Sequence, residues 1–192
     1  MVKTEEYFQL QIESIDELRL WLSGNYDQKE SIWLVTFKKE FTNKYVSRWD
    51  VLDELICYGW IDGVRRKLDH ARTMQLVSPR KAQHWAKSYK DRVEALEKEG
   101  RMHHSGLKLV EKAKKSGLWT FMDDVDQLIV PKDLLEELEN HVGAKEFFES
   151  INPSSKRNAL RWIKLAKSTT TRNKRINKLA ELSSKGQKLP NS

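Results

Sequence analysis

The sequence predicts an α+β fold that is mostly helical, with a small antiparallel sheet of about three strands in the N-terminal half and helices in the C-terminal half. Three segments before Pro79 are rich in β-branched and aromatic residues, which is typical of strands. After Pro79 the apolar residues recur every three or four positions, which is typical of amphipathic helices. Three strands are enough to form a small sheet with helices packed on it.

Composition limits the class of protein. The chain has 192 residues, of which 33% are charged, and its mean hydropathy is −0.71. No apolar run approaches the roughly 18 residues needed to cross a bilayer. The first 18 residues carry early acids and no long apolar stretch, so we do not expect a secretory signal. A single cysteine excludes an internal disulfide. We therefore expect a cytoplasmic protein without a membrane span.

Capping residues predict the first two helices. Ser14 and Ser47 each stand three residues before an acid, a spacing in which the serine oxygen accepts a backbone N–H of the first turn. Gly24 and Gly59 end these helices, because glycine readily adopts the left-handed backbone of a helix terminus. The inward faces carry Ile15, Leu18, Trp21 and Leu22 in the first helix, and Val51, Leu52, Leu55 and Ile56 in the second.

The predicted strands cover residues 32–38, 60–68 and 72–77. The last two form an antiparallel hairpin that turns at residues 69–71, which sets Trp60 opposite Pro79. Strand alternation then puts Trp60, Asp62, Val64, Arg66 and Leu68 on one face.

Helices are predicted for most of the chain beyond Pro79. Residues 119–130 have the pattern of a loop, Pro131 is suited to the first position of a helix, and Asn152-Pro153 provides a cap and a first position. The inward faces carry Trp85, Tyr89, Val93 and Leu96; Leu107, Val110 and Ala113; Leu134, Leu135 and Leu138; Ala144, Phe147, Phe148 and Ile151; Leu160 and Ile163; and Ile176, Leu179 and Leu182.

The predicted organisation is one compact body in two parts. Residues 1–82 form a sheet-containing subdomain, residues 83–185 form a helical subdomain packed on it, and residues 186–192 are expected to be a disordered tail. The connections are short, and no Gly/Ser-rich linker divides the two parts.

A set of short motifs in this order gives the chain a family resemblance. They are Ile32–Lys39, Gly59–Gly63, Pro79-Arg80, Gly100–Met102, Arg161–Ile163 and Thr169–Arg172. Their pattern resembles the bacterial YdeI/OmpD-associated family, also called bacteriocin-protection proteins, over roughly residues 30–185. The resemblance implies tolerance of toxic peptides or association with an outer-membrane porin, and it implies no particular reaction. The chain departs from the family's small polar residues at positions 83–86 and at Tyr89, which puts a polar site built on them in doubt.

The central block suggests a candidate ligand site at Trp60, Asp62, Arg80 and Trp85. Between Trp60 and Val64, Asp62 is expected to be partly desolvated and to need a polar or cationic partner. Arg80 is the nearest candidate, one residue beyond the position opposite Trp60. One hypothesis is a buried Asp62–Arg80 pair that stabilises the fold. The other is a small polar pocket walled by the two tryptophans.

No metal, cofactor or catalytic residue is predicted. The five histidines and one cysteine do not have the spacing of a zinc site, and phosphate-loop, dinucleotide and hydrolase motifs are absent. Cys57 lies near the end of an apolar helix, so we expect a buried structural thiol rather than a nucleophile.

The net charge of +7 is unevenly distributed. Residues 153–192 carry 11 basic residues and one acid, Glu181, so the rest of the chain has a small negative balance. A basic tail of this kind favours weak binding of polyanions, with Lys174, Arg175 and Lys178 as the candidate contacts. The alternative is a solvated helical face.

Three functions remain open at this point. The first is a binding or adaptor protein in envelope stress or antimicrobial-peptide tolerance, acting on an unidentified partner. The second is an enzyme with a pocket at Asp62, Arg80 and Trp85. The third is a nucleic-acid binder that uses the basic C-terminal helices, although recognisable nucleic-acid modules are absent.

Overall fold

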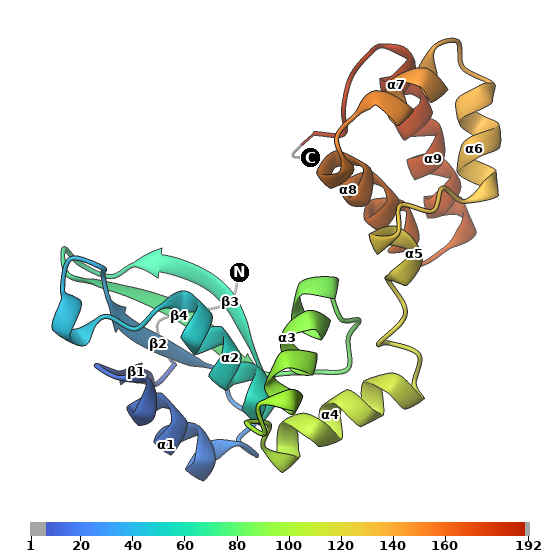
Figure 1. Ribbon diagram of the computed structural model, residues 1–192. Helices are drawn as coiled ribbons and strands as arrows, with labels where there is room; N and C mark the ends of the chain where they lie inside the picture. Colours follow the sequence, from blue (N-terminus) through green and yellow to red (C-terminus); the bar gives the residue numbers. More distant parts are fainter. Residues whose placement is uncertain (1–6, 191–192) are drawn as a thin grey trace. The chain divides into compact units, whose positions relative to one another are not determined.

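Two units, residues 1–120 and 121–192, make up the chain in the computed structural model, which describes residues 7–190. Figure 1 shows the first unit in blue to green and the second in yellow to red. Each unit has a hydrophobic core of its own, and the boundary predicted at residue 82 lies inside the first unit. Parts of two predicted segments, the non-signal N-terminus and the tail at 186–192, lie outside the described residues. Within that tail, the Gln187 N–H donates to the Leu182 carbonyl at 2.9 Å.

The sheet of the first unit has four strands among the described residues, in the order β1-β2-β4-β3. Their bounds are β1 Gln9–Gln11, β2 Ile32–Phe37, β3 Trp60–Lys67 and β4 Arg72–Pro79. The mostly helical α+β prediction is confirmed, but the sheet is mixed, because β1 runs parallel to β2. The sequence missed β1 because three residues are too few to show an alternating pattern.

The hairpin of β3 and β4 has the predicted register at its open end, where Trp60 is paired with Pro79. A β-bulge then shifts the register, so that Asp62 pairs with Val77 but Arg65 pairs with Gln75. The extra residue changes which side chains share a face beyond Asp62. The predicted common face is therefore wrong from Val64 onward, and the Val64 side chain is exposed.

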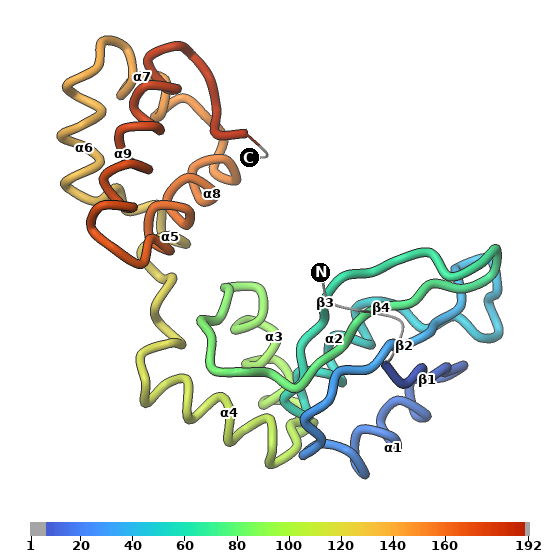
Figure 2. The backbone as a smooth tube through the Cα atoms, turned by 180° about the vertical axis from the view of Figure 1, so that it is seen from behind, coloured from blue at the N-terminus to red at the C-terminus, as the bar shows by residue number. Residues whose placement is uncertain are grey.

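Helices α1 and α2 begin as predicted. In α1, Ile15–Asn25, the Ser14 hydroxyl accepts the Glu17 N–H, and in α2, Arg48–Tyr58, the Ser47 hydroxyl accepts the Asp50 N–H. Gly59 follows α2 with a left-handed φ of 80°. Figures 1 and 2 show α2 lying across one face of the sheet, where Leu55 packs with Trp60 in the first core cluster.

Two more helices complete the first unit, α3 at Lys87–Lys98 and α4 at His104–Lys115. Both pack against α2, and a second core cluster forms between them. Its buried members are Leu52, Ile56, Cys57, Trp85, Val93, Leu96, Val110 and Ala113. Because α2 carries one core on each side, α3 and α4 belong to the same unit as the sheet.

The second unit is a small helical bundle. Its helices are α5 Asp123–Asp126, α6 Lys132–Glu139, α7 Ala144–Ser150, α8 Pro153–Lys164 and α9 Thr169–Ser184. The predicted loop at 119–130 contains the short helix α5, whose four residues leave no periodic signal. Pro131 caps α6 rather than occupying its first position, whereas Pro153 is the first residue of α8 as predicted. In the described part of the chain, no helix combines the length and the apolar character that a membrane crossing requires.

Candidate functional site

Arg80 is the most unusual side chain of the first unit, because it is 8% exposed and has only one hydrogen-bond partner among the described residues. Its Nη2 donates to the His84 carbonyl at 3.1 Å, while Nε and Nη1 are buried without a partner. The guanidinium carbon lies 3.7 Å from the centre of the Trp85 ring, which gives it a cation–π contact. The charge is therefore held by stacking and lacks a hydrogen-bonded counter-ion.

Burial lowers the pKa of Arg80 to about 10, and the nearby Tyr89 and Asp62 oppose this shift only in part. The group still carries its charge at neutral pH. A buried cation with unpaired N–H groups is destabilising unless an anion or a set of acceptors satisfies it. Arg80 is thus a candidate ligand-binding group, because a bound anion would satisfy its unpaired N–H groups.

A cavity of about 690 Å³ opens beside Arg80. Its charged lining residues are mostly basic, since five basic side chains face a single acid, Asp27. The basic residues are Lys29, Arg80, Lys81, Lys108 and Lys112. A positively charged concave surface of this size is suited to a small anion or to the anionic part of a larger molecule.

Helix α4 supplies one wall of this cavity. Lys108 and Lys112 are four residues apart, so they lie on the same face of the helix. Leu109, next to Lys108, packs over Gly59, where an added Cβ would come within 2.6 Å of the leucine side chain. This contact with the end of α2 turns the lysine-bearing face of α4 toward the end of β4, where Arg80 and Lys81 follow Pro79.

Aromatic rings also line this cavity. Tyr26, Tyr58 and His104 line the cavity, and the Tyr26 ring lies 5.1 Å from His104 and 4.9 Å from His103. Tyr58 stacks on His103 with ring centres 4.7 Å apart. The rings give the cavity an apolar side, so a ligand with both an anionic and an apolar part matches its surface.

Asp62 does not pair with Arg80, so the predicted ion pair is wrong. The Tyr89 hydroxyl donates to Asp62 Oδ1, and Gln75 Nε2 donates to Oδ2 at 3.2 Å. Burial and the carboxylate of Asp62 both raise the pKa of Tyr89, which keeps the phenol protonated as a donor. The Arg80 guanidinium is instead drawn onto Trp85 and acts on Asp62 only through space.

The four predicted ligand residues do not form one pocket. Arg80 and Trp85 are brought into contact, but Trp60 lies in the other core, where its ring meets Trp21 edge-on at 5.4 Å. Asp62 lines neither the 690 Å³ cavity nor the smaller cavity that Arg80 also lines. Half of the predicted set therefore belongs to the candidate site.

Most of the basic residues that line the 690 Å³ cavity were not predicted from the sequence. A sequence signal for Lys108 and Lys112 does exist. They are four residues apart with Leu109 between them, in a segment whose other apolar residues face the core, so they share a helical face outside that core. Lys81 follows Arg80 directly in the chain. No local pattern indicates that Tyr26, Lys29 and Tyr58 would meet them, because these residues come from distant segments.

The three residues predicted to bind polyanions lie on α9 in the second unit. Lys174 is exposed, whereas Arg175 donates to the Trp162 carbonyl and stacks near its ring. Lys178 lies 3.7 Å from Glu181, within the distance of an exposed ion pair. All three residues therefore lie on α9, but only Lys174 is exposed without an ion pair or hydrogen bond to another described side chain or backbone group.

Cys57 is buried, and burial raises the pKa of its thiol to about 12, in agreement with the predicted structural role. In the part of the chain that the structure describes, no group of three or more His, Cys, Asp or Glu side chains is placed to hold a metal ion. The candidate site itself presents cations, hydrogen-bond donors and aromatic surfaces.

Two family models match this chain. Residues 10–109 match the model described as Domain of unknown function (DUF8412), and residues 127–186 match the model described as Bacteriocin-protection, YdeI or OmpD-Associated. The family resemblance is confirmed at residues 127–186, whereas the Gly59–Gly63 and Pro79-Arg80 motifs lie in the segment that the other model matches. Neither the curated proteins nor the solved structures contain a match.

Proposed function

We propose that this protein binds a small anionic ligand. The chain belongs to the DUF8412 family over just over half its length, and it carries a YdeI/OmpD-associated domain at residues 127–186. The ligand occupies the cavity beside Arg80, between the end of β4 and helix α4. In this proposal the second unit, which contains the YdeI/OmpD-associated domain, provides the role in bacteriocin protection.

The observation that carries the proposal is the partnerless charge of Arg80. A buried guanidinium normally has a carboxylate or phosphate partner, because isolated buried charge is costly. Here Nε and Nη1 lack one, while four lysines surround the cavity that Arg80 lines. An oxyanion in the cavity supplies the missing counter-charge.

Binding is favoured over an enzyme built on Asp62. Both carboxylate oxygens of Asp62 are occupied by Tyr89 and Gln75, and the residue lines neither cavity. A carboxylate that serves as an acid or base has to reach the reacting group within hydrogen-bond distance. Asp62 instead links α3 to the hairpin, since its partner Tyr89 belongs to α3 and Asp62 to β3.

We propose that this binding contributes to tolerance of bacteriocins or related antimicrobial peptides, and that the protein acts in the cytoplasm. The family description supports the first part, and the amino-acid composition supports the second. A small anion is then the signal or metabolite that the protein senses or sequesters.

The Lys108→Gln/Lys112→Gln variant is expected to bind inorganic phosphate about thirtyfold more weakly than the parent protein. Each exposed charge contributes about 1 kcal/mol to an ion a few ångströms away, and 1.4 kcal/mol is tenfold in Kd. Phosphate binding is measured as the rise in melting temperature with phosphate concentration, against sodium chloride of equal ionic strength.

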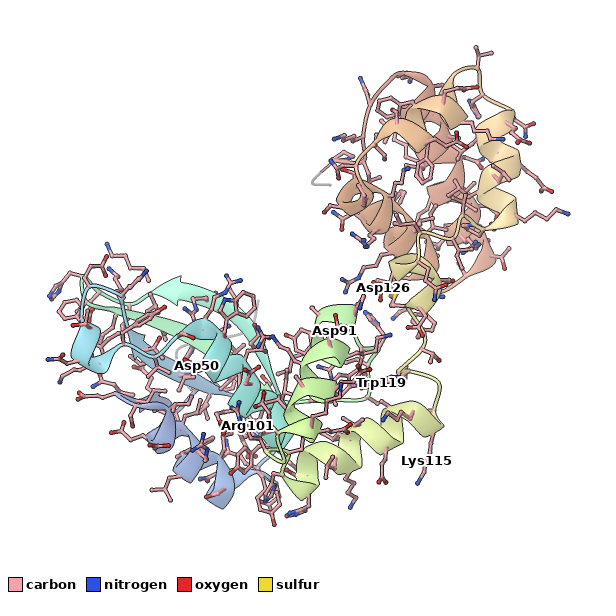
Figure 3. The ribbon with its side chains drawn as sticks, viewed as in Figure 1. Asp50, Asp91, Arg101, Lys115, Trp119 and Asp126 are labelled. Carbon is pink, nitrogen blue, oxygen red and sulfur yellow. The ribbon has the colours of Figure 1, made fainter. Side chains whose placement is uncertain are left out.

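The matched control is Lys98→Gln/Lys115→Gln, which removes the same charge from the ends of α3 and α4. Lys115 lies at the C-terminal end of α4 (Figure 3), and neither lysine lines either of the two cavities that Arg80 lines. This control should bind phosphate like the parent and restore bacteriocin tolerance to a strain that lacks the protein, whereas the cavity variant should do neither. Equal phosphate binding by the two variants would contradict the proposal.

A second proposal concerns weak, non-specific binding of polyanions by residues 153–192. This proposal rests on the charge balance of the segment, which has eleven basic residues and one acid. Lys174 is exposed and is one of the proposed contacts to the polyanion. The binding constant for duplex DNA should fall with salt by roughly 0.9 log unit per phosphate contact per log unit of salt. Titration at two salt concentrations tests this for the parent and for Lys174→Gln/Arg175→Gln/Lys178→Gln. An unchanged affinity in the variant means that this face is only solvated.

A further inference from the structure

A second, more apolar cavity of about 370 Å³ shares Arg80 with the first as a lining residue. We infer that the ligand of the proposed site is an amphiphilic anion, with a phosphate or carboxylate head at Arg80, Lys81 and Lys112 and a short apolar group in this second cavity. The inference rests on the proposed function, because it names the class of molecule that the same site takes.

The walls of the second cavity are mainly hydrocarbon. Trp85, Leu109, Ala113 and Leu118 line it, and Ala82 lies at an exposed position of its rim. Trp85 and Ala113 are buried members of the core cluster below, so these walls are held by packing. A volume within the usual range of ligand pockets and an apolar lining suit an alkyl or similar group of several carbons.

The head group is placed by the residues that the two cavities share. Arg80, Lys81, Leu109 and Lys112 line both of them, so the three cations stand where the cavities meet. An oxyanion bound there adjoins both the apolar cavity and the larger basic cavity. Arg80 links the charged surface to the apolar one, because its guanidinium is stacked on Trp85, which is part of the apolar wall.

Binding should therefore strengthen with the length of the apolar group. In calorimetric titrations with inorganic phosphate, butyl phosphate and hexyl phosphate, each buried methylene contributes about 0.8 kcal/mol, or roughly fourfold in Kd. Hexanol, which has the chain without the charge, should bind much more weakly than hexyl phosphate. Vesicles of equal parts phosphatidylcholine and phosphatidylglycerol should not sediment the protein, because the site takes a dissolved molecule.

A blocking variant locates the apolar group. Ala82→Phe places a ring at the rim of the second cavity, whereas Ala86→Phe makes the same change outside both cavities. The first variant should retain phosphate binding and lose the dependence on chain length, and the second should retain both. Thermal melting of both variants in the absence of ligand checks that they fold.

The outcomes separate this inference from the proposed function. If inorganic phosphate binds and chain length has no effect, the site takes a plain anion and the amphiphile is excluded. If neither phosphate nor the alkyl phosphates bind, both proposals fail. Hexanol binding equal to that of hexyl phosphate, vesicle binding that Lys108→Gln/Lys112→Gln abolishes, or an unaltered chain-length effect in Ala82→Phe would each overturn the assignment made here.

Discussion

Gly106→Ala is expected to destabilise the protein by about 3 kcal/mol, although alanine is intrinsically the better helix former. Gly106 lies in the first turn of α4, where a Cβ would sit 2.2 Å from the Cys57 carbonyl oxygen and 2.9 Å from that of Ile56. Both contacts are backbone atoms of α2, which cannot move aside as a flexible side chain does. The added methyl therefore forces α4 away from α2.

Urea unfolding of the parent and variant measures this loss as a change in the free energy of unfolding. The matched control is Gly24→Ala in α1, because no atom would lie within 4 Å of its Cβ. That variant should gain about 0.5–1 kcal/mol from the reduced freedom of the unfolded chain. Equal effects at Gly24 and Gly106 would refute the close contact between α2 and α4.

The same substitution links packing to binding. Helix α4 carries Lys108 and Lys112, and its position is fixed where Gly106 meets the end of α2 and where the Ser105 hydroxyl donates to the Tyr58 carbonyl at 2.9 Å. A displaced α4 moves these lysines relative to Arg80. Gly106→Ala should therefore also weaken phosphate binding, whereas Gly24→Ala should leave it unchanged.

Removing both arginine partners of Glu54 is expected to cost about 3–5 kcal/mol, because it leaves a buried carboxylate without compensation. Glu54 lies on α2 and is 2% exposed. Arg19 of α1 and Arg101, labelled in Figure 3, donate to Glu54 Oε1 at 2.8 and 2.9 Å. The cluster joins α1, α2 and the segment after α3 around one charge.

The Arg19→Ala/Arg101→Ala variant should lose more stability than Glu54→Ala. Both arginines are partly exposed and can return to water when the carboxylate is removed, whereas Glu54 cannot. Lys98→Ala/Lys115→Ala removes the same charge from exposed positions and should change stability by no more than about 0.5 kcal/mol. A loss in Glu54→Ala as large as in the double arginine variant would show that the asymmetry is absent.

The pH dependence should report the same cluster. Burial alone would raise the pKa of Glu54, but hydrogen bonds from Arg19 and Arg101 outweigh it and lower the pKa below its ordinary 4.5. The ion cluster therefore stabilises the fold above that pH, and its contribution disappears as the pH falls through the lowered value. Without the arginines, burial raises the pKa, so the variant gains stability on acidification. Its deficit relative to the parent should shrink from pH 7 downward.

Local signals in the sequence determined the helices and one strand register. Ser14 and Ser47 cap their helices because a serine side chain satisfies an N–H that lies within its own first turn. Gly59 ends α2, and Pro153 begins α8, for equally local reasons of backbone geometry. The pairing of Trp60 with Pro79 follows from the short hairpin, where few residues separate the two strands.

The tertiary structure alone decided which side chains meet. The sequence brought Arg80 and Trp85 into one candidate site, but it could not indicate that Tyr89 would take Asp62 as its partner or that Arg80 would remain without a counter-ion. The bulge before Arg65 changes the faces of β3, and such an insertion has no periodic signature. Lys29, Lys108 and Lys112 converge only because α4 packs on the end of α2. Local propensity thus determined the elements, whereas packing between distant segments created the charged cavity.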